Sequence, residues 1–171
     1  MSNMKEIKIE KVTLNVGAGK DPKELERGVA MIKQVTGIEP VKTTTNKRIQ
    51  GWGLRPGLPI GCKLTLRGKQ AEDMADRILY AKDNLLKESS FDNYGNISFG
   101  IKEYVDIKDA KYSVDIGMMG LQATITLTRP GYRVMRRSLK QRKISKNHRI
   151  KKEEAVTFMQ DKYNVKLGES Q

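Results

Sequence analysis

Residues 55–68 read RPGLPIGCKLTLRG, a proline-containing loop that runs directly into a strand with two chemically different faces. Successive side chains of a β-strand point to opposite sides of the sheet. The apolar side chains therefore share one face: Cys62, Leu64 and Leu66. The polar side chains share the other: Lys63, Thr65 and Arg67. The first face is suited to a hydrophobic core, and the second offers an ammonium, a hydroxyl and a guanidinium group to a partner.

The same alternation recurs in two other segments of the chain. Between positions 12 and 16, three apolar residues alternate with Thr13 and Asn15, and residues 121–128 alternate in the same way with Gln and Thr. An ordinary half-solvated antiparallel sheet also has this pattern, because Thr is favoured in strands for its β-branch. If the strands share one sheet, its outer face is rich in groups that bind phosphates, riboses and base edges.

The order of the elements predicts an α+β fold. Asp21-Pro22 is a typical helix start and Gly37 a typical stop, and the apolar residues between them recur at helical spacing. We expect one domain over residues 1–171, with an antiparallel sheet of about five strands, helices packed on one face and the other face open to a partner. The segments predicted are strands at 7–16, 41–46, 62–68, 97–101 and 121–128, and helices at 22–36, 70–87 and 153–163.

The positive charge of the chain is concentrated in one block. The formal net charge is +13, and residues 129–152 contain 11 Lys and Arg with no acidic residue. The other 147 residues hold 22 basic and 20 acidic side chains, so they are nearly neutral. A block of this kind is expected to bind a polyanion. An anionic membrane is the weaker alternative, because the block has no apolar stripe with Trp, Phe and Leu. We expect nucleic acid, and no membrane partner.

Residues for catalysis or metal binding are scarce. His148 is the only histidine and Cys62 the only cysteine, which is too few for a zinc site, so we expect no metal and no cofactor. The sequence Gly17-Ala18-Gly19-Lys20 follows a strand and precedes a helix. It lacks the third glycine of a dinucleotide-binding loop, where Pro22 stands, and the spacing of a Walker loop. We therefore expect a binding protein without catalytic residues. With no disulfide possible and no apolar signal segment at the start of the chain, we expect it in the cytosol.

A long loop at residues 47–61 is a second candidate site. Loops of about fifteen residues are uncommon in compact domains and usually functional. The only tryptophan, Trp52, stands between two glycines in this loop. A lone Trp often folds back over the core. Flanking glycines favour the alternative, in which the indole is presented to a base or a ribose together with nearby arginines.

Several of these segments resemble a known family, that of large-subunit ribosomal protein five, which binds 5S rRNA in the central protuberance. The similarity extends from about Lys8 to Thr128. The segments that carry it are Asn15-Val16-Gly17-Ala18-Gly19, Thr36-Gly37 with Pro40, Leu54-Arg55-Pro56-Gly57 through Pro59-Ile60-Gly61, Lys63 to Gly68, and Phe91-Asp92 with Gly95-Asn96 through Glu103. Ile38 stands where bacterial members have an RNA-contacting glutamine. The absence of the bacterial N-terminal helix and the additional basic block resemble the archaeal branch.

The resemblance implies a structural protein, cytoplasmic and within the large ribosomal subunit, whose open sheet face binds 5S rRNA. Asn15, Thr65 and Arg67 match family residues that contact the RNA. With the charge pattern, the expected rRNA-binding set is Thr13, Asn15, Lys63, Thr65, Arg67, Arg133, Arg136 and Arg137. The long loop is implied to reach the peptidyl-site tRNA, through Gln50, Trp52, Arg55 and Pro56. Large-subunit rRNA, neighbouring proteins of the central protuberance and a small-subunit bridge are further implied partners. The competing hypothesis is a free-standing regulatory RNA-binding protein.

Overall fold

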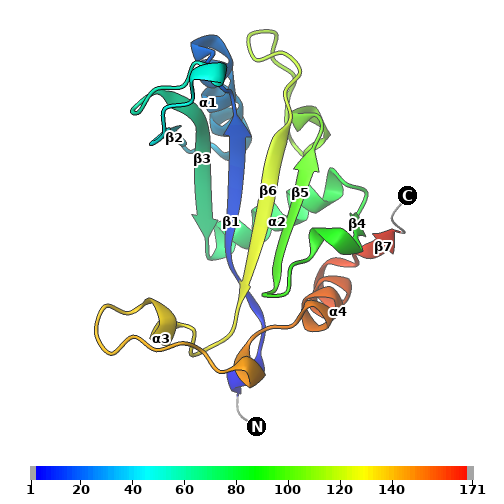
Figure 1. Ribbon diagram of the computed structural model, residues 1–171. Coiled ribbons are helices and arrows are strands. Elements are labelled where there is room, and N and C mark those ends of the chain that lie inside the picture. The colour runs from blue at the N-terminus through cyan, green and yellow to red at the C-terminus, as the bar shows by residue number, and fades with distance from the viewer. Residues whose placement is uncertain (1–2, 169–171) are drawn as a thin grey trace.

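A five-stranded antiparallel sheet dominates the computed structural model, which describes residues 3–168 (Figure 1). The predicted unit, residues 1–171, extends beyond the described residues at both ends. The spatial order of the strands is β2-β3-β1-β6-β5. Their bounds are β1 Lys8–Gly17, β2 Val41–Thr44, β3 Pro59–Arg67, β5 Asn96–Ile101 and β6 Leu121–Thr128. The fold is the predicted α+β fold.

Two helices cover one face of this sheet, and in Figure 1 they lie behind the strands. They are α1 Pro22–Thr36 and α2 Lys69–Tyr80. The predicted signals at both ends of α1 are confirmed: the Asp21 side chain accepts a hydrogen bond from Lys23 N, and Gly37 ends the helix at φ 73°. Gly28 lets α1 approach the sheet, because a Cβ there would lie 3.1 Å from Val16 Cγ1.

The hydrophobic core lies between the sheet and these helices. As predicted, Cys62, Leu64 and Leu66 are buried, as are Val12, Leu14 and Val16 of the neighbouring strand. Burial raises the pKa of the Cys62 thiol, so Cys62 behaves as a small apolar residue. The alternation in the sequence therefore predicted correctly which face of each strand is buried.

The remaining elements are short, apart from one helix near the end of the chain. That helix is α4 Lys152–Tyr163, and α3 is a single turn at Arg133–Arg136. A small parallel sheet pairs β4 Leu85–Lys87 with β7 Lys166–Gly168. The single-turn 3-10 helices are η1 Asn3–Lys5, η2 Gln50–Trp52, η3 Glu88–Ser90, η4 Tyr104–Asp106 and η5 Lys146–His148. Among the described residues, no helix is long and apolar enough to cross a membrane.

The prediction of a helix over 70–87 was wrong in its second half. The helix ends at Tyr80, and Asp83 and Asn84 take left-handed φ values of 53° and 54°. These residues form a turn, after which Leu85 enters β4, where its side chain is 52% exposed. Asp and Asn tolerate the left-handed conformation, and this turn chemistry competes with the helical spacing.

Candidate nucleic-acid interface

The open face of the sheet carries three rows of residues that cross four strands, and every residue of these rows except Gly100 has a polar side chain. Within each row the strands contribute in the order β3, β1, β6, β5, and the register places one residue of each strand beside the next. From the upper to the lower end of Figure 1 the rows are Lys63-Asn15-Gln122-Gly100, Thr65-Thr13-Thr124-Ser98 and Arg67-Lys11-Thr126-Asn96. All five sheet residues predicted to bind rRNA are therefore brought together on one face.

Hydrogen bonds along the rows orient their side chains. Asn15 Nδ2 donates to Gln122 Oε1 at 3.1 Å, and the hydroxyls of Ser98 and Thr124 lie 3.1 Å apart. Lys63 and Thr65 are exposed. Within residues 3–168, no carboxylate forms an ion pair with Lys63. Its ammonium group is available to a phosphate.

A β-bulge at the lower end of β1 places an acidic residue beside two of the predicted rRNA-binding arginines. The register of β1 against β6 shifts between Ile9 and Lys11, and Glu10 lies at this shift. Arg67 Nη1 lies 3.5 Å from Glu10 Oε1, and the Arg136 guanidinium binds both carboxylate oxygens of Glu10. The Glu10 side chain is 13% exposed, whereas that of Arg67 is 62% exposed. Arg67 therefore remains accessible to RNA.

This bulge was not predicted, although the sequence contains a signal for it. Ile7 and Ile9 alternate, but the next buried residue is Val12 rather than position 11. One extra residue in the apolar alternation is what a bulge requires.

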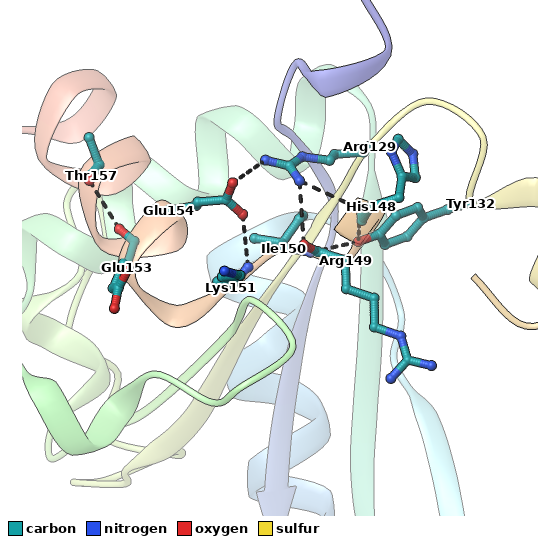
Figure 2. Close-up of polar contacts among 9 residues, drawn as sticks. All are labelled: Arg129, Tyr132, His148, Arg149, Ile150, Lys151, Glu153, Glu154 and Thr157. Atoms are coloured by element: carbon teal, nitrogen blue, oxygen red, sulfur yellow. Dashed lines mark hydrogen bonds and ion pairs between the residues drawn. The ribbon is translucent and has the colours of Figure 1, made fainter. Parts of the chain in front are cut away.

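The basic extension, residues 129–152, is anchored to the domain at both of its ends (Figure 2). Arg129, 6% exposed, donates from Nη2 to Glu154 Oε1 at 2.9 Å and from Nη1 to the carbonyls of His148 and Arg149. The Tyr132 hydroxyl accepts a hydrogen bond from Ile150 N at 3.0 Å, and Ile150 is fully buried. The two ends of the extension are therefore fixed beside the start of α4.

His148 belongs to this anchor and not to a chemical site. Its Nε2 lies 2.9 Å from the carbonyl oxygen of Pro130, and its ring packs edge-on against Tyr132. A carbonyl accepts only, so Nε2 is the protonated nitrogen. Among the described residues, no cluster of three His, Cys, Asp or Glu side chains is arranged to hold a metal ion.

The middle of the extension carries the other predicted arginines. Arg133 is exposed in α3. Arg137 bonds through Nε and Nη2 to the carbonyl oxygen of Lys140, at 3.0 and 2.8 Å. Arg142 N donates to Val134 O at 3.2 Å, which closes the loop. Of the three predicted arginines, the structure brings Arg136 to the sheet face and leaves Arg133 and Arg137 on the projecting loop.

The loop at 47–61 is more regular than predicted. Its last residues, 59–61, already belong to β3, and Ile49 and Leu54 form a two-way backbone bridge below the tip. Its four predicted tRNA-contacting side chains are all exposed: Gln50, Trp52, Arg55 and Pro56. Trp52 is 69% exposed, so the alternative in which it covers the core is wrong.

The loop and the basic extension lie at opposite ends of the sheet in Figure 1. The structure therefore separates the candidate tRNA residues from the arginines of the extension, whereas Lys63 and Asn15 of the upper row lie at the same end of the sheet as the loop. A partner at the loop and a partner at the extension would be separated by the length of the strands.

A tight backbone approach occurs at the top of β1, at Gly61. Gly61 pairs with Gly17, and a Cβ on Gly61 would lie 2.5 Å from Val16 O. Gly19 has φ 60°, a left-handed turn conformation.

Comparisons with known proteins match nearly the full chain to one protein family. The model of the C-terminal part of the ribosomal protein L5 family matches residues 59–158, and that of ribosomal protein L5 itself matches residues 2–55. Large ribosomal subunit protein uL5 of Sulfurisphaera tokodaii is 44% identical over 167 residues, covering 97% of this chain and 94% of that protein. The uL5 of Nanoarchaeum equitans is also 44% identical, over 96% of this chain and 97% of its own length. The uL5 of Methanobrevibacter smithii is 39% identical, over 96% of this chain and 97% of its own length.

These relatives are archaeal, as the sequence pattern predicted, and members of their family are structural parts of a cytoplasmic RNA–protein particle and not enzymes. The chain belongs to the ribosomal protein L5 family and is a structural, RNA-binding protein of the large ribosomal subunit.

Proposed function

We propose that the chain binds 5S rRNA on the open face of its sheet and helps attach this RNA to the subunit in the central protuberance. The three polar rows are the observation that carries the proposal, since they place Thr13, Asn15, Lys63, Thr65 and Arg67 side by side. Hydroxyl and amide groups can bind riboses and base edges, while Lys63 and Arg67 supply charge for phosphates.

The basic extension provides a second contact in this proposal, with rRNA of the large subunit. Arg136, Lys143 and Arg149 of the extension lie next to the lower row of the sheet, so one RNA surface can reach both. The exposed tip of the loop at 47–61 contacts the peptidyl-site tRNA at the opposite end. Neighbouring proteins of the central protuberance and of the small subunit bind the remaining surface, and residues 1–171 act as one unit.

A matched pair of arginine variants tests the sheet face. Arg67→Ala removes a guanidinium from the open face, and Arg27→Ala removes one from the exposed side of α1. Net charge falls equally in both. In filter binding to 5S rRNA, Arg67→Ala is expected to weaken binding by about 1–3 kcal/mol, and Arg27→Ala to bind like the parent. Equal affinities of the two variants, with both proteins folded, would overturn the assignment of the face.

A further inference from the structure

A groove of about 590 Å³ lies where the basic extension meets the lower end of the open sheet face. Its floor is the lowest polar row, which consists of Arg67, Lys11, Thr126 and Asn96. Its wall comes from the extension, including Tyr132, Arg136, Lys143, Ile144 and Arg149. The volume is typical of sites that enclose a small molecule, about 300–1,000 Å³.

An aromatic side chain with an accessible ring lines this groove. Tyr94, in the turn before β5, is 62% exposed, and the Arg149 guanidinium lies 6.0 Å from its ring centre. The backbone carbonyl of Arg149 accepts a hydrogen bond from Arg129. Figure 2 shows that the Arg149 side chain points away from the hydrogen bonds of Arg129. A nucleobase stacks on tyrosine rings and on guanidinium planes.

The charge around the groove favours an anion. Five cationic side chains line it, against the single carboxylate of Glu10: Lys11, Arg67, Arg136, Lys143 and Arg149. Glu10 binds Arg67 and Arg136 together, so their guanidinium groups converge at one point of the floor. Glu10 uses one N–H of each Arg136 Nη and approaches only Nη1 of Arg67, so the remaining N–H groups of both guanidiniums can bind the oxygens of a phosphate.

We propose that this groove takes up one unpaired nucleotide of ribosomal RNA. The base stacks against Tyr94 and Arg149, and the phosphate lies against Arg67 and Arg136. An RNA duplex keeps its bases stacked inside, whereas loops and bulges can place a base in a pocket. The proposal rests on the proposed function, because it specifies how the extension and the sheet bind rRNA together.

Three tyrosine variants test this inference. Tyr94→Ala removes the ring and Tyr94→Phe keeps it. Tyr112→Ala is the control, because Tyr112 is 56% exposed and lies outside the groove. Each variant is titrated with transcribed 5S rRNA and with transcribed large-subunit rRNA over a range of salt concentrations. For one of these RNAs, Tyr94→Ala is expected to lose between about fivefold and a hundredfold in affinity with an unchanged salt slope, because stacking releases no counterions. Tyr94→Phe and Tyr112→Ala are expected to bind like the parent.

Four outcomes would overturn the inference. If the parent binds both RNAs and Tyr94→Ala binds them equally well, the groove holds no base, while the proposed function stands. If Tyr94→Ala changes the salt slope, position 94 contributes to contacts with the phosphate backbone of the RNA and not to base stacking. If Tyr94→Ala weakens the binding of poly-glutamate as much as it weakens the binding of RNA, the groove does not select a base. A parent that binds neither RNA would overturn the proposed function as well. Photo-crosslinking from benzoylphenylalanine at position 94 is expected to reach one unpaired nucleotide.

Discussion

Replacing Glu154 with glutamine should destabilise the protein through the anchor of the basic extension. The Arg129 side chain is 6% exposed and that of Glu154 is 40% exposed, and their Nη2–Oε1 distance is 2.9 Å. Glutamine keeps the size of the side chain and removes its charge. The glutamine amide has one acceptor oxygen, so it cannot accept from both Arg129 Nη2 and Lys151 N, as the two carboxylate oxygens of Glu154 do. The buried guanidinium also loses its counter-charge, and its Nε has no partner among the described residues.

The expected loss of stability depends on how far the Arg129 and Glu154 side chains are exposed to water. A hydrogen bond to a charged group is worth about 1.5–3 kcal/mol, and breaking a fully buried ion pair costs about 3–5 kcal/mol. Because water reaches Glu154, we expect a loss of about 2–3 kcal/mol in the free energy of unfolding. In a chain of this length, that corresponds to a decrease in Tm of about 4–12 °C.

Urea unfolding followed by circular dichroism at pH 7 measures the loss, with Glu153→Gln as the matched control. Both changes remove one negative charge from the first turn of α4, where it interacts favourably with the helix dipole. The Glu153 side chain is exposed, and in Figure 2 its contact is the hydrogen bond that its backbone carbonyl accepts from Thr157. Equal stability of the two variants would refute the account of the anchor.

The same contact predicts a dependence on pH. Burial raises the pKa of Glu154. The hydrogen bonds from Lys151 N and Arg129, together with the charges of these residues, lower the pKa by a larger amount, so it lies below its ordinary value. The folded state therefore favours the carboxylate. Its stabilisation is complete above the pKa of the unfolded chain, about 4.3, and is lost as the pH falls through the lower pKa of the folded state. The difference between the parent and Glu154→Gln should shrink over that range. A difference that stays constant down to pH 2 would contradict the assignment.

Three further predictions concern the other elements. Replacing residues 133–146 with a short Gly-Ser linker should flatten the salt dependence of rRNA binding, by about 0.7–0.9 for each phosphate that the shortened protein no longer binds. An unchanged slope would mean that the extension serves a non-RNA partner. Replacing residues 50–58 with a short Gly-Ser linker should leave 5S rRNA binding intact and weaken tRNA retention in the peptidyl site of reconstituted ribosomes. If the variant instead loses 5S rRNA binding and binds tRNA normally, the loop belongs to the rRNA interface. Gly61→Ala should lower the free energy of unfolding, measured in urea, by about 1–3 kcal/mol, because its Cβ would lie 2.5 Å from Val16 O. In the control, Gly100→Ala, the Cβ enters open space, so the free energy of unfolding should hardly change. Equal stabilities of the two variants would contradict the close approach at Gly61.

Local signals in the sequence predicted the sheet and its first helix well. The alternation in β1, β3 and β6 depends on burial of one face, and the cap of α1 depends on residues within one turn of it. The same signals placed five of the candidate rRNA residues on one face. That face follows from strand pairing alone, because paired strands in register share their outward side chains.

Contacts between distant parts of the chain could not be predicted in this way. Arg129 is stabilised by Glu154, 25 residues later, and Arg136 by Glu10, 126 residues earlier. In the sequence, the extension is a run of charge with few apolar residues, and nothing in it identifies these two acidic partners. The pairing of β4 with β7 also joins distant parts of the chain, Leu85 with Lys166. The helical spacing therefore assigned Leu85 to a helix that had already ended.

The central claim is that 5S rRNA lies on the open face of the sheet, and directed cleavage tests it most directly. Cys62 is the only cysteine and is fully buried, so a reagent added at a new cysteine reacts there selectively. An iron chelate is attached to Ser98→Cys, on the open face, or to Glu26→Cys, on the exposed side of α1. The account predicts hydroxyl-radical cuts in bound 5S rRNA from position 98 and none from position 26. Cuts from position 26 alone, or equally from both positions, would contradict it.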